Sequence, residues 1–181
     1  MSKVYTSAVV IIPPPEKWAS IQEIRKIYDR NFHRWMPHIT LLYPFRPENE
    51  YPTLEKDFSE IGKSISPFEI ILHDFHYFNH GHQRYTLWLR PEQVDLIKDL
   101  QVRILKIVPD CNDVNKYKKG FTPHLSVGQI NGKNKLLKII ENLQNNWHKI
   151  RFFLNEIYFI SREKSKTSQF EIKKRIQLKK E

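Results

Sequence analysis

The stretch Arg34–Phe45, RWMPHITLLYPF, has a counterpart later in the chain at Phe121–Gln129, FTPHLSVGQ. Each stretch places the pattern Pro-His-x-Thr/Ser inside an apolar run that is typical of a strand. In a chain of 181 residues with this composition, two such matches are expected by chance on the order of one time in a thousand. The repetition therefore predicts two equivalent structural positions, each of which carries a histidine: His38 in the first and His124 in the second.

Side chains alternate between the two faces of a strand. In the first copy, His38 and Thr40 should project from one face and the aliphatic residues between and after them from the other. In the second copy, His124, Ser126 and Gly128 should share a face. We expect Gly128 to remove side-chain bulk next to Ser126, so that a ligand can approach the backbone.

Two imidazoles and two hydroxyls would line one groove if the two halves of the chain pack about a pseudo-twofold axis. Such a set suits phosphodiester hydrolysis without a metal, since a neutral histidine can accept a proton and a protonated one can donate it. The hydroxyls can donate hydrogen bonds to the non-bridging oxygens, where charge grows. The alternative is that each histidine only caps a buried backbone group beside its Thr or Ser.

The rest of the chain alternates strand-like and helix-like segments without a linker. The expected strands are Val4–Ile12, His38–Phe45, Phe68–Phe78, Tyr85–Pro91, Thr122–Ile130, Arg151–Arg162 and Phe170–Leu178. The expected helices are Glu16–Arg30, Tyr51–Ile65, Glu92–Val108 and Lys133–Trp147. This order predicts one α+β domain, 1–181, with mostly antiparallel sheets lining a central groove and helices outside. Its pseudo-symmetric lobes are expected at about 1–85 and 86–181, and exchange of the termini between the lobes is left open.

Charge and composition favour a globular protein with a polyanionic partner. The chain is 40% hydrophobic and 13% aromatic, and it carries a net charge of +10. Residues 162–181 contain eight Lys or Arg and three Glu, a net charge of +5. A basic surface attracts nucleic acid or nucleotide phosphates, and the alternative is an ordinary solvated lysine-rich face.

Several function classes are not favoured by the sequence. The single cysteine, Cys111, excludes an internal disulfide framework and suits a reducing compartment. The apolar run in residues 1–15 is too short for a signal peptide, and the sequence contains no run of about 18 apolar residues. We therefore expect no membrane span and a cytoplasmic or nuclear location. We also expect a monomer.

Other polar and aromatic residues are weaker candidates for a site. The stretch HDFHYFNHGH, 73–82, is rich in histidine, but its spacing mixes a strand with a turn, so we predict no metal and no cofactor. His76 lies an even number of residues from Phe78 and could face the groove. Four residues are candidates for substrate binding, by stacking or phosphate attraction: Tyr117, Lys119, Phe121 and Arg162. Core positions are expected for Trp35, Phe45 and Trp88, and Phe121 has a core position as its alternative.

The two motifs resemble those of the 2H phosphoesterase superfamily, which is named for two His-x-Thr/Ser motifs in a bilobal α+β fold. The stretch MPHITLLYPF is similar to its first motif. The second, FTPHLSVGQ, is similar to the form in eukaryotic 2′-5′ RNA ligase-like and cyclic phosphodiesterase members. The two runs FEIILHDFHYF and YTLWLRP resemble the intervening hairpin. The similarity extends from Val4 to Leu178.

This resemblance implies a metal-independent phosphoesterase that acts on 2′,3′-cyclic phosphates or 2′-5′ linkages of RNA or small nucleotides. It implies that His38 and His124 are the acid-base pair and that Thr40 and Ser126 hold the scissile phosphate. The sequence departs from the pattern at two places. Ser126 stands where many members have Thr, and Val-Gly-Gln replaces an Ala-Arg pair of bacterial members, so their additional phosphate-binding arginine is not carried over.

The most favoured hypothesis is hydrolysis of 2′,3′-cyclic phosphates of nucleotides or RNA ends. Cleavage or ligation of 2′-5′ linkages is the first alternative, although no P-loop for ATP-driven ligation is present. A non-catalytic RNA- or nucleotide-binding module is the second.

Overall fold

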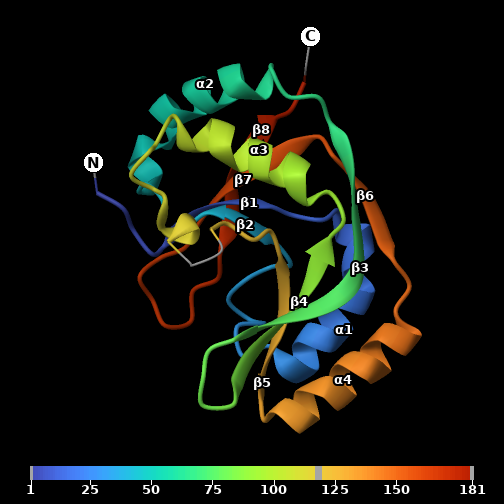
Figure 1. Cartoon of the computed structure of the whole chain (residues 1–181). Helices are drawn as coiled ribbons and strands as arrows, with labels where there is room; N and C mark the ends of the chain where they lie inside the picture. The colour runs from blue at the N-terminus through green and yellow to red at the C-terminus, as the bar shows by residue number, and fades with distance from the viewer. Residues whose placement is uncertain (1, 117–119, 180–181) are drawn as a thin grey trace.

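The computed structural model describes residues 2–116 and 120–179. Within these residues the chain forms eight strands and four α-helices (Figure 1). The strands are β1 (Ser7–Ile11), β2 (Ile39–Leu42), β3 (Phe68–Asn79), β4 (Arg84–Pro91), β5 (Leu125–Asn131), β6 (Ile150–Leu154), β7 (Glu156–Ser161) and β8 (Glu171–Gln177). The helices are α1 (Trp18–Tyr28), α2 (Tyr51–Gly62), α3 (Val94–Leu105) and α4 (Lys133–Asn146). The α+β class and the antiparallel sheet are confirmed.

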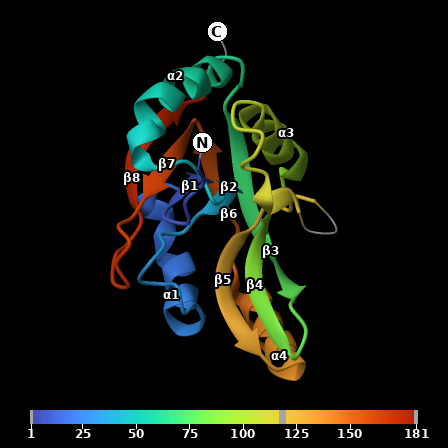
Figure 2. The same ribbon diagram turned by 90° about the vertical axis from the view of Figure 1, so that its left-hand side faces the viewer.

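All eight strands belong to one curled antiparallel sheet with the order β6-β3-β4-β5-β2-β1-β7-β8. One half of the sheet contains β3, β4, β5 and β6, from the middle of the chain. The other half contains the N-terminal strands β1 and β2 beside the C-terminal strands β7 and β8. The N-terminal and C-terminal strands therefore lie side by side in one half of the sheet. Strands β2 and β5 meet where the two halves join (Figure 2).

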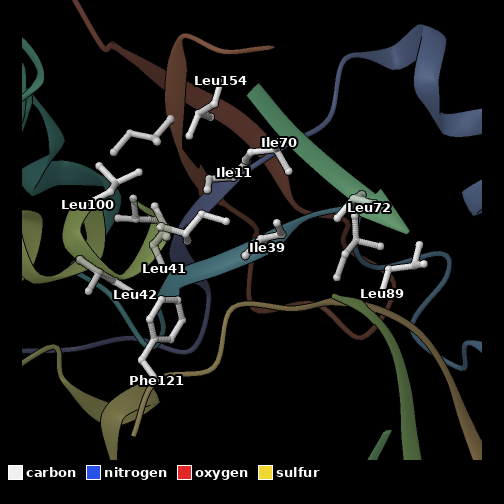
Figure 3. Close-up of a cluster of buried hydrophobic side chains, with 14 of the residues drawn as sticks. Ile11, Ile39, Leu41, Leu42, Ile70, Leu72, Leu89, Leu100, Phe121 and Leu154 are labelled. Carbon is white, nitrogen blue, oxygen red and sulfur yellow. The ribbon is translucent and has the colours of Figure 1, made fainter. Parts of the chain in front are cut away.

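Each half of the sheet carries its own pair of helices. Helices α1 and α4 pack against β5 and its neighbours, and α2 and α3 pack against β8, β2 and each other (Figures 1 and 2). The main core lies beneath the helices, because apolar side chains recur there at every second strand position. Figure 3 shows part of this core, in which Ile11, Ile39 and Leu41 from β1 and β2 meet Leu100 of α3 and Leu154 of β6.

The prediction of one continuous strand over Arg151–Arg162 is wrong. The segment forms β6 and β7, with Asn155 between them. Strand β6 pairs with β3, whereas β7 pairs with β1 in the other half of the sheet. The apolar residues run across the break without interruption, so local periodicity could not reveal that the chain changes partners there.

A second, smaller apolar cluster lies on the opposite face of the β1–β7 half. It contains Ala8, Val10, Ile12, Tyr158, Ile160 and Phe170. Trp18, Trp35, Met36 and Tyr43 pack against it. Of the four side chains that cover this face, Trp18 begins α1 and the other three come from the segments on either side of β2. Among the helices that the structure describes, none is long and apolar enough to cross a membrane.

Candidate active site

Both motif histidines lie immediately before a strand at the centre of the sheet. His38 precedes β2, which begins at Ile39, and His124 precedes β5, which begins at Leu125. Ile39 and Leu125 are fully buried in the core, whereas both histidines are half-buried. The predicted alternation thus holds for His38 with Thr40 and for His124 with Ser126, and these motif side chains share the face of the sheet away from the main core. We call this the histidine face.

The two motifs run past each other in opposite directions. Ile39 of β2 pairs with Leu125 of β5 in an antiparallel bridge. Continuation of this register places His38 across from Ser126 and Thr40 across from His124. Each histidine therefore faces the hydroxyl residue of the other motif, which is the arrangement of a local twofold axis.

The two imidazoles are fixed in the same way by the backbone. The Nδ1 atom of His38 lies 2.7 Å from the carbonyl oxygen of Met36, and Nδ1 of His124 lies 2.7 Å from that of Thr122. A carbonyl oxygen only accepts hydrogen bonds, so Nδ1 must carry the proton in each ring. The Nε2 atom is then the nitrogen left for a substrate, with a lone pair when the ring is neutral.

Burial changes the acidity of both rings in the same direction. Burial lowers the pKa of His38 to about 4. The hydrogen bond to Met36 opposes this change, and the positive charges of Arg25 and His124 add to it. Burial also lowers the pKa of His124, against the opposing hydrogen bond to Thr122. In the unliganded protein both rings thus favour the neutral form at neutral pH, because a charged imidazole loses hydration there.

The two motif hydroxyls are available to a ligand. Thr40 and Ser126 are half-buried on the histidine face. Over residues 2–116 and 120–179, neither hydroxyl has a hydrogen-bond partner. A half-buried hydroxyl without a partner can donate to an incoming oxygen without first breaking an internal bond.

Aromatic rings surround both histidines. Trp35 stacks on His38 with ring centroids 4.6 Å apart and planes at 17°. Phe78 meets His124 edge to face at 4.9 Å, and Trp88 meets it at 5.8 Å. The sequence placed Trp35 and Trp88 in the core and did not identify Phe78. Trp88 is indeed buried, but its contact with His124 depends on the pairing of Trp88 with Ser126, which sequence periodicity does not reveal.

His76 lies on the histidine face, as its spacing from Phe78 allowed. It pairs with Trp88 across β3 and β4, and the two rings stack with centroids 5.0 Å apart. Burial lowers the pKa of His76, and the charge of Arg90 acts in the same direction. Among the described residues, no group of three His, Cys, Asp or Glu side chains is arranged to hold a metal ion.

A buried ion pair holds the backbone of Trp35, whose ring stacks on His38. Arg25 of α1 binds Asp29 with a distance of 2.8 Å between Nε and Oδ2, and both side chains are almost fully buried. Arg25 also donates from Nη2 to the carbonyl oxygen of Trp35 at 2.8 Å. Asp29 accepts a hydrogen bond from Gln129 of β5. The end of α1 thereby connects the segment before the first motif to the strand that follows the second.

The prediction that Gly128 lies beside Ser126 and opens the backbone to a ligand is wrong. The β4–β5 pairing shifts register between Leu87–Gly128 and Trp88–Ser126, so Val127 is an additional residue in β5. This bulge turns Gly128 to the helix-covered face. A Cβ atom on Gly128 would lie 2.5 Å from Cβ of Tyr28 in α1. Glycine is needed there for helix packing.

Two of the four weaker candidates, Phe121 and Arg162, lie within the described residues. Phe121 is 8% exposed and lies among the aliphatic side chains of the core (Figure 3), so its burial supports packing and argues against stacking on a base. Arg162 is half-buried, and its Nη1 group donates to the carbonyl oxygens of Glu163 and Ser165. Its role in phosphate binding stays a prediction. Tyr117 and Lys119 lie outside the described residues.

Two surface cavities lie apart from the motif residues. One, of about 420 Å³, is lined by Tyr28 and residues of α4. The other, of about 220 Å³, is lined by residues around Ile12, Phe153 and Tyr158. We place the candidate site at the histidines, because neither cavity is lined by a residue of the two His-x-Thr/Ser motifs.

Comparison with known proteins identifies the family of the chain. The sequence pattern of the 2′-5′ RNA ligase superfamily matches residues 13–166. A search of curated proteins gives no match. Similar solved structures include the protein TT0787 of Thermus thermophilus, with a TM-score of 0.63 and 18% identity over 97% of this chain and 98% of that chain.

The LigT protein of E. coli in its apo form is also similar, with a TM-score of 0.63 and 14% identity over 99% of this chain and 100% of that chain. The same protein complexed with 3′-AMP has a TM-score of 0.60 and 14% identity over 98% and 99% of the two chains. These low identities show a shared fold, and the superfamily pattern covers most of the sequence. The chain therefore belongs to the 2′-5′ RNA ligase superfamily, whose members include the 2H phosphoesterases.

Proposed function

We propose that this protein is a metal-independent phosphodiesterase that hydrolyses RNA-derived 2′,3′-cyclic phosphates of nucleotides or RNA ends. The reciprocal placement of the two motifs carries the proposal: His38 lies across from Ser126, and His124 lies across from Thr40. Two imidazoles with the same tautomer, and two hydroxyls that have no hydrogen-bond partner among the described residues, thus lie on one face of the sheet. This arrangement can provide a general acid, a general base and two hydrogen-bond donors to the phosphate oxygens at the same time.

In this mechanism one histidine is neutral and the other is protonated. The neutral ring accepts a proton through Nε2 from a water molecule, whose oxygen attacks phosphorus. The bond between phosphorus and one ribose oxygen breaks, and the protonated ring donates its proton to that leaving oxygen. Thr40 and Ser126 donate hydrogen bonds to the non-bridging oxygens, which gain charge in the transition state. Proton exchange with solvent then restores both rings.

Membership in the superfamily supports a phosphoesterase or RNA-ligase-like role. E. coli LigT, which shares the fold, has been crystallised with 3′-AMP, with phosphate and with ATP. A nucleotide substrate for the present chain is consistent with these complexes of a distant neighbour.

The test is a product assay in EDTA with a panel of substrates. The panel contains 2′,3′-cyclic mononucleotides, 2′-5′-linked dinucleotides and RNA with cyclic, phosphorylated or hydroxyl 3′ ends. We expect opening of the cyclic phosphate to a monoester. Loss of activity in EDTA that added metal restores would contradict the metal-independent mechanism.

The superfamily description favours a second candidate, which is cleavage or ligation of 2′-5′ linkages. The same four side chains could carry this reaction, because proton transfer is reversible at each step. Preferential turnover of the 2′-5′ dinucleotide in the same panel would identify it. Tight binding of the panel without any turnover would instead favour a non-catalytic binding module.

A further inference from the structure

The connection between β7 and β8, residues 162–170, contacts Arg34 and Trp35, which precede the first motif histidine, His38. The backbone N–H of Phe170 donates to the carbonyl oxygen of Arg34 at 2.9 Å, and Arg34 donates from Nη2 to the carbonyl of Lys166 at 3.4 Å. The Phe170 ring stacks on Trp35 with centroids 3.7 Å apart, and Trp35 stacks on His38. A continuous series of rings therefore joins this connection to the candidate active site.

Internal hydrogen bonds give the connection a defined shape. Arg162 donates from Nη1 to the carbonyl oxygens of Glu163 and Ser165 and to the hydroxyl of Ser168. The Ser168 hydroxyl in turn donates to the same two carbonyls. The guanidinium of Arg162 also lies over the Phe170 ring, 5.5 Å from its centroid. A surface that is already ordered loses less conformational entropy when it binds a partner.

The region presents three cations to solvent, alongside the exposed carboxylate of Glu163. Lys164 and Lys166 in the connection and Arg34 beside it are exposed, and in the described part of the chain none of the three takes part in an ion pair. The next strand differs, because Lys173 is paired with Glu171. The positive potential of the region therefore remains available to a polyanion.

Two tyrosine rings lie beside Trp35, the half-buried ring of Tyr43 and the exposed ring of Tyr5. Tyr43 meets Trp35 edge to face at 5.4 Å and meets Tyr5 at 5.7 Å, and Tyr5 is 66% exposed. Burial raises the pKa of Tyr43, while the positive charges of Arg162 and Arg34 act against this change. Aromatic and basic side chains thus occur together on one surface.

We propose that this surface, the basic strip of Tyr5, Arg34, Tyr43, Lys164 and Lys166, binds single-stranded RNA on the 5′ side of the reacting phosphate. The inference rests on the proposed function and narrows its substrate from mononucleotides to RNA ends. Cations that contact phosphates, together with rings that stack on bases, are the combination that binds single strands without sequence preference. The ring series from Phe170 to His38 places the strip beside the reacting group.

Binding and turnover are measured separately to test this proposal. Binding is followed by fluorescence anisotropy with an unreactive single-stranded oligoribonucleotide of about ten nucleotides that ends in a 3′-hydroxyl, within the usual site size of such surfaces. Turnover is followed with a 2′,3′-cyclic mononucleotide and with the same oligoribonucleotide ending in a 2′,3′-cyclic phosphate. The test variant is K164Q/K166Q. The control is K135Q/K138Q, which removes two exposed lysines from α4.

We expect K164Q/K166Q to weaken oligonucleotide binding on the order of tenfold at low salt and to reduce its salt dependence. The KM for the cyclic oligonucleotide should rise by a similar factor, whereas the kinetics on the mononucleotide and the behaviour of the control should match the wild type. Tyr5→Ala should weaken binding without changing the salt dependence, because it removes stacking and no charge.

The two proposals fail in distinguishable ways. Oligonucleotide affinity that is equal in the wild type and K164Q/K166Q, or equal losses in K164Q/K166Q and K135Q/K138Q, would overturn the basic strip even if the mononucleotide is hydrolysed. Absence of turnover on every cyclic phosphate, combined with strip-dependent RNA binding, would overturn the proposed hydrolysis and leave the strip as an RNA-binding surface.

Discussion

Ile39 of β2 and Leu125 of β5 form the antiparallel bridge that joins the two halves of the sheet. Both side chains are completely buried in the core. The residues on either side of this bridge, which point to the opposite face, are the two histidines and the two hydroxyl residues of the motifs. One buried apolar pair therefore sets the relative position of the four groups to which we assign the chemistry.

Removal of either motif histidine should abolish most of the activity and leave the fold intact. We expect His38→Gln and His124→Gln each to lower kcat by about 10²- to 10⁴-fold, the usual contribution of a positioned acid or base. Initial rates on a 2′,3′-cyclic nucleotide and thermal unfolding would be measured together. The control is His148→Gln, which changes an exposed histidine outside the motifs and should retain full activity. Turnover within twofold of wild type in either motif variant would rule out the assigned roles.

The activity should be highest at mildly acidic pH. The pKa of His38 is lowered to about 4, and that of His124 is also lowered. The protonated form of the acid disappears as the pH rises through its lowered pKa. The value of kcat/KM, which reports the free enzyme, should therefore begin to fall at a pH lower than 6.5, the ordinary pKa of histidine. The base must be neutral, so the acid limb should lie lower, near pH 4.

A pH series of kcat/KM would measure both limbs, whose apparent pKa values belong to the coupled pair. An alkaline limb well above pH 7 would show that burial does not control the acidity of the acid.

The buried Arg25–Asp29 pair should matter far more to stability than a surface pair with the same geometry. Arg103 binds Asp99 of α3 through the same atoms, at the same 2.8 Å and at the same separation of four residues in the chain. The buried pair is 2% and 4% exposed, whereas the side chains of Arg103 and Asp99 are 42% and 59% exposed. Arg25→Met should lower the free energy of unfolding by about 3–5 kcal/mol, because it leaves a buried charge unpaired.

Arg103→Met is the matched control and should cost less than about 1 kcal/mol, since water solvates its partner. Chemical denaturation of both variants measures the difference. Equal losses would mean that burial of the Arg25–Asp29 pair has no energetic consequence.

Gly128→Ala should destabilise the fold through α1. The added methyl would lie 2.5 Å from Cβ of Tyr28 and 3.1 Å from its carbonyl oxygen, so the helix must move away from β5. Overpacking of this kind costs about 1–3 kcal/mol in the free energy of unfolding, as measured by denaturation. Asn131→Ala, at the exposed end of the same strand, should change it by less than about 0.5 kcal/mol. An unchanged Gly128→Ala protein would restore the original expectation that this glycine faces open space.

Local patterns predicted most of the elements but not their partners. The four helices follow apolar spacings of three and four residues, so the sequence located them to within a few residues. The segment Arg151–Arg162 shows the limit of this reasoning. Its apolar residues fit a single strand, yet β6 and β7 separate at Asn155, because each pairs with a different half of the sheet.

The candidate site shows the same division. Alternation along each strand correctly placed His38 with Thr40 and His124 with Ser126. It failed at Gly128, because the register shift at Val127 is a property of the β4–β5 pairing and not of β5 alone. Trp35 could not be recognised as the ring that covers His38, since the stack requires the turn between α1 and β2 to fold back onto the sheet.

The amino-acid sequence was sufficient to predict the motif residues, their faces and the family resemblance, because these depend on residues close together in the chain. The folded chain was needed to show that each histidine lies across from the other motif's hydroxyl, that both rings are held through Nδ1, and that burial lowers both pKa values. These properties depend on the Ile39–Leu125 bridge, which joins segments far apart in the chain. Pairing and desolvation between distant segments arise only when the sheet closes between β2 and β5.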